Sequence, residues 1–186
     1  YNLIKEFYLP FSSVKDFSVF GKNLVLKGYG YNFSGIVLEI DCEDTISRNV
    51  FKEISAYIIK DCSKPESFWF KGFDKQSTNS LLYRPLIEKF SKPPLLIRAH
   101  SGPTASFEGS YNSEVQYWTA KGYFVAEVNY GGSSGFGREY RDRLKGNWGL
   151  VDAFDCEFAA KSLISRGQAD QSLIAIEGGS AGGFTT

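Results

Sequence analysis

The chain has 186 residues, enough for one complete domain or for parts of two, and enough to bury a core. Hydrophobic residues make up 42% and charged residues 23% of it, which is typical of globular proteins. Lys plus Arg and Asp plus Glu are equal at 21 each, so no net charge would attract nucleic acid or anionic lipid. No apolar run approaches the ~20 residues of a membrane helix. From the charge balance and this absence together, we expect neither nucleic acid nor a membrane as a partner.

The cysteines Cys42, Cys62 and Cys156 are widely spaced and form no CxxC pair. Together with the only histidine, His100, they offer no metal-ligand cluster, so we expect no zinc site, no disulfide framework and no cofactor. We therefore expect the protein to reside in a reducing, cytoplasmic compartment. The chain contains no Met and stops just after a helix begins, so we expect it to be a piece of a longer protein.

Residues 1–62 are predicted to form short strands separated by turn residues. Four strands at this spacing predict about one β-propeller blade or a small meander, and a single copy does not decide between them. The strands are expected at residues 14–20, 24–26, 35–40 and 50–54. The polar, proline-containing segment Asp61–Glu66 is the expected domain boundary.

Residues 63–186 are predicted to form an α/β fold. A strand pair at residues 68–70 and 81–83 comes first, and strands then alternate with helices, which indicates a parallel-rich sheet with helices on both faces. The strands are expected at residues 95–99, 123–128 and 173–176, and the helices at residues 113–121 and 151–166. Gly122 and Gly167 are expected to close the two helices.

The sequence Gly178-Gly179-Ser180-Ala181-Gly182 fits the pattern G-x-S-x-G, between an apolar strand and a helix start. In such a nucleophile elbow the serine lies on a strained turn that exposes its hydroxyl at the carboxyl edge of the sheet. Side chains at the flanking glycines Gly178, Gly179 and Gly182 would collide with backbone or with substrate. The N–H of Ala181 can donate a hydrogen bond to an oxyanion.

A phosphate-binding turn of a dinucleotide-binding domain is the alternative interpretation of this segment. Residues 178–183 do not match G-x-G-x-x-G, and they follow the third helix-flanked strand rather than the first. Both observations disfavour dinucleotide binding.

His100-Ser101-Gly102-Pro103 follows the first strand of the alternating series, where a second oxyanion donor is expected. Gly102 can offer its N–H in a conformation that residues with side chains avoid. A tight turn with His100 packed locally is an equal alternative. His100 precedes Ser180, whereas the order in α/β-hydrolases is nucleophile, acid, histidine, so His100 is not the expected base. The acid and the base are expected after Thr186, and this chain alone is expected to be inactive.

Several segments, in this order, resemble the prolyl oligopeptidase family (the S9 serine peptidases), most of all its acylaminoacyl-peptidase and dipeptidyl-peptidase-like branch. The resemblance runs from about residue 64 to the end of the chain. Its matching segments are Lys92–Leu96, His100–Thr104, Gln116–Thr119, Val128–Tyr140, Trp148-Gly149, Asp152, Asp155 and Gly178–Gly183.

The resemblance implies an α/β-hydrolase peptidase domain over residues 63–186, truncated after the nucleophile, and the last propeller blade over residues 1–62. It implies Ser180 as the acylating nucleophile, the N–H groups of Ala181 and Gly102 as the oxyanion hole, and short peptides as substrates. The family has Gly where this chain has Ser101. If that position needs a positive φ, a Cβ there would add strain of ~1–2 kcal/mol.

Two other functions stay open at this point: a carboxylesterase or lipase of the same fold, and a non-catalytic hydrolase-like binding protein. Trp148 is expected to be a packing anchor, and Asp152 and Asp155 to complement the dipole of their helix. The residue preference, exo- or endopeptidase action and assembly into a homo-oligomer are not decided by the sequence.

Overall fold

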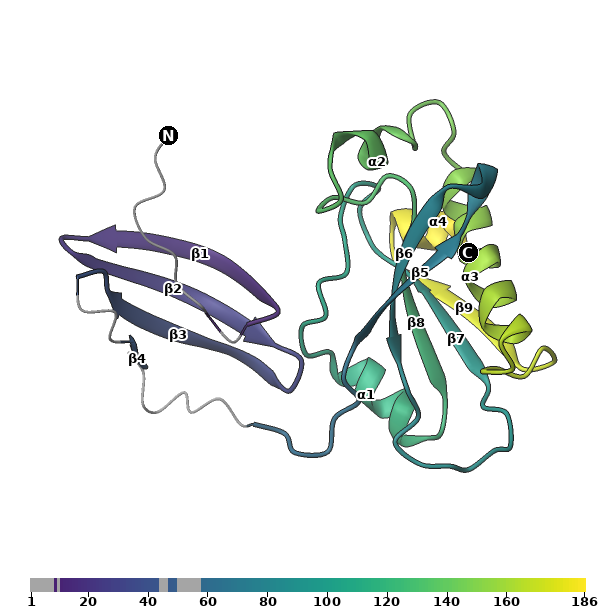
Figure 1. Cartoon of the computed structure of the whole chain (residues 1–186), viewed down its shortest axis with the longest axis horizontal. Helices are drawn as coiled ribbons and strands as arrows, with labels where there is room; N and C mark the ends of the chain where they lie inside the picture. Colours follow the sequence, from purple (N-terminus) through teal and green to yellow (C-terminus); the bar gives the residue numbers. More distant parts are fainter. Residues whose placement is uncertain (1–8, 10, 44–46, 50–57) are drawn as a thin grey trace. The chain divides into compact units, whose positions relative to one another are not determined.

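The computed structural model describes residues 9, 11–43, 47–49 and 58–186 (Figure 1). The chain divides into two compact units, one made of Tyr1–Cys62 with Glu108–Asn112 and the other of Ser63–Phe107 with Ser113–Thr186. Among the described residues, each unit contains one β-sheet. In the described part of the chain, no helix is both long and apolar enough to cross a membrane.

The first unit is an antiparallel sheet in which each strand pairs with the next along the chain. Its strands are β1 (Ser13–Phe20), β2 (Asn23–Gly30), β3 (Phe33–Asp41) and β4 (Ser47–Asn49). Gly21, with a φ of +57°, opens the two-residue loop between β1 and β2. The first three predicted strands are confirmed, and the fourth, predicted at residues 50–54, lies outside the described residues. One sheet does not show a repeat, so the propeller assignment stays a prediction.

The second unit is a mixed sheet with the strand order β5-β6-β8-β7-β9. Its strands are β5 (Glu66–Lys71), β6 (Ser77–Tyr83), β7 (Leu95–Ala99), β8 (Phe124–Asn129) and β9 (Ile174–Gly178). Its helical elements are η1 (Phe73–Lys75), α1 (Ser113–Ala120), α2 (Arg138–Asp142), α3 (Val151–Ser165) and α4 (Ala181–Thr185).

The parallel strands of this α/β unit are β8, β7 and β9, whereas β5 and β6 are antiparallel to their neighbours. The short connection through η1 explains the antiparallel pair, because two parallel strands need a crossover of a dozen or more residues. The predicted α/β fold and its leading strand pair are therefore confirmed, with the parallel part confined to three strands.

Helices cover both faces of this sheet, and the side chains of β7 alternate between the faces (Figure 1). Leu95 and Ile97 lie in one buried cluster with Leu163 of α3. Leu96, between them, lies in another cluster with Val115 of α1. All six residues of β8 are buried, since this strand also has both faces covered.

Helix α1 ends at the glycine predicted to close it. Gly122 has a φ of +89°, the left-handed conformation typical of a residue that follows a helix. The N–H of Gly122 donates to the Thr119 carbonyl and that of Tyr123 to the Trp118 carbonyl, each at 3.1 Å, which is a Schellman motif. The Trp118 and Tyr123 rings pack 4.9 Å apart. Gly167 ends α3 with a φ of +70°, so both predicted ends are confirmed.

Candidate active site

Ser180 lies at the turn where β9 ends and α4 begins. Its backbone has a φ of +53° and a ψ of −117°, a conformation that residues with a side chain rarely adopt. Such strain persists only where the surrounding structure enforces it, and it is frequent at functional sites. Ser180 is also exposed. The predicted strand, strained turn and helix are thus all present around this serine.

Two of the three predicted elbow glycines are required by close backbone contacts. A Cβ on Gly178 would lie 2.4 Å from the backbone of Gly182. A Cβ on Gly182 would lie 2.3 Å from the carbonyl oxygen of Ala99, the last residue of β7. Gly179 has more room, because its nearest neighbour would be the Ser101 Oγ at 3.3 Å. These contacts place the β9–α4 turn against the end of β7 and the loop that follows it.

The loop after β7 has the left-handed conformation expected at Gly102, with a φ of +78°. The Gly102 carbonyl accepts a hydrogen bond from the Ala105 N–H at 3.2 Å. Ser101 is not among the residues with a positive φ. The substitution of serine for the family's glycine therefore causes none of the strain considered above.

His100 is buried, with 4% of its surface exposed, and both ring nitrogens have hydrogen-bond partners. Nδ1 lies 3.0 Å from the Gly102 carbonyl oxygen, and Nε2 lies 2.7 Å from the Ser133 Oγ. The ring stacks on Tyr130 with the centroids 4.2 Å apart. Burial lowers the pKa of His100, which favours the neutral ring. The local packing of His100 is therefore present, and neither ring nitrogen is free to act as a base.

Two buried aspartates of α3 hold the candidate site in place, and their roles were not foreseen from the sequence. Asp152 accepts hydrogen bonds from the Gly149 N–H at 2.6 Å and from the Thr185 hydroxyl of α4 at 2.7 Å. Asp155 accepts the Gly131 N–H of the loop after β8 at 2.7 Å, and burial raises the pKa of this carboxyl. Both aspartates lie near the start of α3, as the predicted complement to the helix dipole requires. They also bind the backbone of neighbouring loops, and Asp152 binds α4. Two carboxylates three residues apart at the start of this helix were the available signal.

A row of charged residues crosses the three parallel strands near their carboxyl ends. Arg98 of β7 pairs in register with Glu127 of β8 and Glu177 of β9, and its guanidinium forms ion pairs with both carboxylates. Tyr83 donates a hydrogen bond to Glu127 at 2.9 Å. Burial raises the pKa of Glu127 to about 7, although Arg98 and Tyr83 both act to lower it. The row ties the strands together just before the loops of the candidate site.

Trp148 is half exposed rather than a fully buried packing anchor. Its ring meets that of Phe184 in α4 edge-on, with the centroids 6.1 Å apart. Trp148, Pro103 and Thr104 all line a groove of about 530 Å³. Pro103 directly follows Gly102, so a substrate segment lying in this groove would be next to the predicted oxyanion donor.

The described residues contain no group of three or more His, Cys, Asp or Glu placed to hold a metal ion. Cys62 and Cys156 carry free thiols. Burial raises the pKa of the Cys156 thiol, which keeps it in the unreactive protonated form. Ser180, exposed and in a strained turn, is the candidate nucleophile of this unit.

Comparisons with known sequences agree with the predicted resemblance. Residues 109–186 match the sequence model of the prolyl oligopeptidase family. Acylamino-acid-releasing enzyme 1 of Oryza sativa subsp. japonica is 39% identical over 93 residues, which are 50% of this chain and 12% of the rice protein. The uncharacterized peptidase YuxL of Bacillus subtilis (strain 168) is 34% identical over 126 residues, which are 67% of this chain and 19% of that protein.

A comparison of structures gives the same result. A puromycin-hydrolyzing peptidase of Mycobacterium tuberculosis matches with a TM-score of 0.88 and 31% sequence identity, over 96% of this chain and 29% of that chain. This chain therefore spans less than a third of each of the three relatives. The predicted relationship to the S9 serine peptidases is confirmed.

Proposed function

We propose that this chain, a member of the prolyl oligopeptidase family, is part of a serine peptidase that hydrolyses short peptides through an acyl-enzyme on Ser180. The observation that carries the proposal is the exposed Ser180 in a left-handed turn between β9 and α4. This is the conformation in which a nucleophile elbow presents its hydroxyl to substrate.

In the proposed reaction the Ser180 Oγ attacks the carbonyl carbon of the scissile peptide bond while a histidine base takes its proton. The N–H groups of Ala181 and Gly102 donate to the resulting oxyanion. The protonated histidine then gives its proton to the leaving amine, which departs and leaves the acyl group on Ser180. A water molecule, activated by the same histidine, hydrolyses this ester and regenerates the serine.

The base and its carboxylate partner are proposed to come from residues that follow Thr186. His100 is the only histidine among the 186 residues, and its two nitrogens bind Gly102 and Ser133 instead of Ser180. Without a base the Ser180 hydroxyl is a weak nucleophile, so this chain alone is proposed to be inactive.

The antiparallel sheet of β1 to β4 is proposed to be the last blade of a β-propeller that admits only short peptides. The meander order of its strands supports this, because a blade is built from four such strands. The cytoplasmic location inferred from the sequence stays a prediction.

The proposal is tested by fluorophosphonate labelling of the full-length protein, with the modified peptide mapped by mass spectrometry. We expect the label on Ser180, no label in Ser180→Ala, and none on residues 1–186 expressed alone. Ser165→Ala, which changes an exposed serine of α3, is the matched control and is expected to label like the wild type. A folded full-length protein that does not label would overturn the proposal and favour the binding-protein alternative.

A further inference from the structure

We propose that the groove beside Pro103 selects peptides that carry a carboxylate near the scissile bond, and that the guanidinium of Arg141 binds this carboxylate. The inference rests on the proposed function, because it assigns a substrate class to the same site. The groove is lined by the loop after β7 and by residues 141–148, and its volume is about 530 Å³. A volume of this size is within the range of the clefts that bind small ligands.

The groove adjoins the candidate active site through two separate elements. One wall includes Pro103, the residue after the predicted oxyanion donor Gly102. Another wall includes Trp148, whose ring packs edge-on against Phe184, about one helical turn after Ser180 in α4. A peptide whose scissile bond lies at Ser180 therefore has its neighbouring residues within reach of the groove.

The lining of the groove is cationic, although the whole chain carries no net charge. It contains two cations, Arg141 and Lys145, and a single carboxylate, that of Asp142. The Lys145 ammonium lies 2.9 Å from the Asp142 carboxylate, so these two charges offset each other. The hydrogen bond from Lys145 lowers the pKa of Asp142, which keeps this carboxylate ionised at neutral pH. The charge of Arg141 is therefore left over in the groove.

Two neighbouring arginines of this segment differ in how their guanidinium groups are used. The Arg143 guanidinium donates to the Ser77 carbonyl at 2.9 Å and lies over the Tyr140 ring, 4.1 Å from its centroid. The Arg141 side chain is exposed and forms no hydrogen bond or ion pair with another residue that the structure describes. A guanidinium presents its N–H donors in a fork that matches the two oxygens of a carboxylate. Arg141 can therefore bind such a group on the substrate without giving up a contact of the fold.

Apolar walls stand beside this charge. The Trp148 ring is 51% exposed, and Pro103 and Leu144 complete the apolar part of the lining. These groups suit the methylene groups that carry the carboxylate of a glutamate side chain, or the side chain of a C-terminal residue. They also keep water from one side of the ion pair, which strengthens its electrostatic attraction. The groove thus fits a carboxylate on an apolar stem better than an anion alone.

The test uses the full-length protein and a short peptide that it cleaves. Glu and Gln are placed in turn at each position around the scissile bond, because these side chains have nearly the same shape and differ in charge. Each peptide is made with a free C-terminal carboxylate and with an amide, which separates the two sources of a carboxylate. The ratio of kcat/KM for the charged and the neutral peptide is measured for the wild type, Arg141→Glu and Arg138→Glu. Arg138 is the matched control, since it is exposed in the same helix α2 and does not line the groove.

For the wild type we expect kcat/KM to be about 5-fold higher for the charged peptide at one position or at the C-terminus, as for a well-formed exposed ion pair. The ratio should fall as NaCl is raised from about 0.05 M to about 0.5 M, because salt screens exposed charges. Arg141→Glu should reverse the preference, whereas Arg138→Glu should keep it within about a factor of two. Equal kcat/KM values for charged and neutral peptides at every position would overturn the inference. So would an equal loss of preference in the two variants, which would assign it to the overall charge.

Asp142→Asn gives a second test in the opposite direction. It removes the carboxylate that binds Lys145, so the ammonium becomes available to the substrate and the preference should increase by about 2–5-fold. A smaller preference than in the wild type would contradict the inference. If the wild-type protein neither labels at Ser180 nor cleaves any peptide, the proposed function fails. A protein that labels and cleaves charged and neutral peptides equally well defeats only the role of the groove.

Discussion

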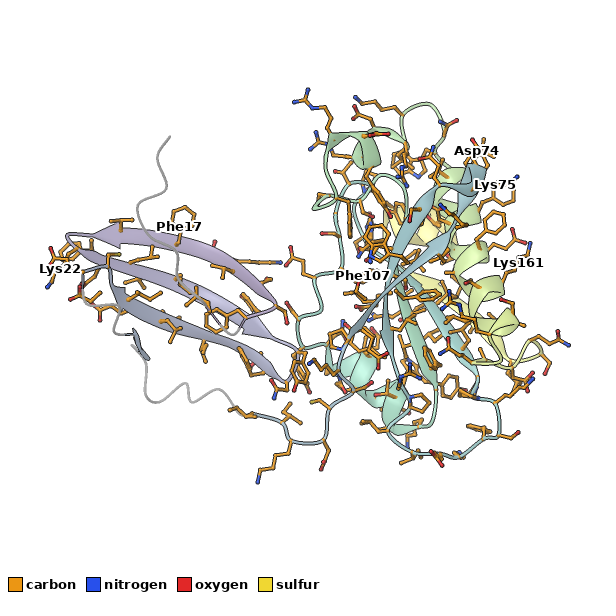
Figure 2. The ribbon with its side chains drawn as sticks, viewed as in Figure 1. Phe17, Lys22, Asp74, Lys75, Phe107 and Lys161 are labelled. Carbon is orange, nitrogen blue, oxygen red and sulfur yellow. The ribbon has the colours of Figure 1, made fainter. Side chains whose placement is uncertain are left out.

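Strands β1 and β8 both contain several large apolar residues, but those residues lie in opposite environments. All six residues of β8 are buried. In β1, Phe17 is 75% and Phe20 is 83% exposed, and Figure 2 shows Phe17 projecting from the sheet. β8 lies between β6 and β7 with helices on both faces, whereas β1 is the outermost described strand of its sheet. Burial here follows from the neighbours of a strand and not from its apolar content alone.

Replacing one phenylalanine in each strand tests this comparison directly and gives the largest expected effect. Phe124→Ala in β8 should lower the free energy of unfolding by about 3–5 kcal/mol, because it empties a closed core. Phe20→Ala in β1 truncates a side chain that is exposed to water in residues 1–186, so in this chain it should change the free energy of unfolding by less than about 0.5 kcal/mol. Urea denaturation of both variants measures the difference. Similar losses would mean that the exposed face of β1 is covered in solution.

Two neighbouring glycines of α4 differ in the same way, because one is far more crowded than the other. Gly182→Ala places a Cβ 2.3 Å from the Ala99 carbonyl and should cost about 2–3 kcal/mol, since neither backbone can move far. It should also abolish labelling of Ser180. Gly183→Ala is the matched control, because its Cβ would lie 3.3 Å from the Gly178 carbonyl and alanine favours a helix. A tolerated Gly182→Ala would show that α4 does not need its close contact with β7.

The five strands and the two longer helices of the second unit were predictable because local signals and burial agree there, whereas the short η1 and α2 were not predicted. The strand predicted at residues 95–99 is β7 to the residue, and Gly122 and Gly167 end their helices as their conformational freedom suggests. Ser180 was also predictable, since a nucleophile elbow is encoded in five consecutive residues. In each of these cases the determining interactions lie close together in the sequence.

Contacts between distant segments were not predictable in the same way. Ser133 binds His100 across 33 residues, and Asp152 binds Thr185 across the same separation. A serine in a glycine-rich loop and an aspartate near a helix start have local explanations that are sufficient by themselves. Only the fold shows that these side chains meet the residues around the elbow.

The hydrogen bond between Asp152 and Thr185 extends the comparison of buried and exposed positions to polar groups. The expected change in the free energy of unfolding is smaller. Thr185→Val leaves one buried carboxylate oxygen of Asp152 without its donor and should cost about 1–2 kcal/mol. Thr186→Val removes an exposed hydroxyl bond to Gly183 and should be nearly neutral. The Tm of the two variants, measured by thermal unfolding, distinguishes them. Equal decreases in Tm would assign the effect to helix propensity instead of the buried hydrogen bond.

The last expected effect concerns the one carboxylate that β8 buries. Burial raises the pKa of Glu127 from its ordinary value to about 7, so between about pH 4.5 and pH 7 the folded state binds more protons than the unfolded state. This group therefore stabilises the fold most at the acid end of that window, and its contribution is lost as the pH rises toward 7, by at most about 1.4 kcal/mol per pH unit. Glu127→Gln should remove that slope.

The slope is isolated by subtracting the unfolding free energies of Glu127→Gln from those of the wild type across the same pH series. The subtraction matters because His100, whose pKa burial lowers, gives a contribution of opposite sign that rises with pH in both proteins. A difference that falls toward neutral pH would show that enclosure on both faces governs charged side chains of β8 as it governs Phe124. A flat difference would mean that Arg98 and Tyr83 compensate the burial of Glu127 completely, and that the contrast with β1 holds for apolar side chains alone.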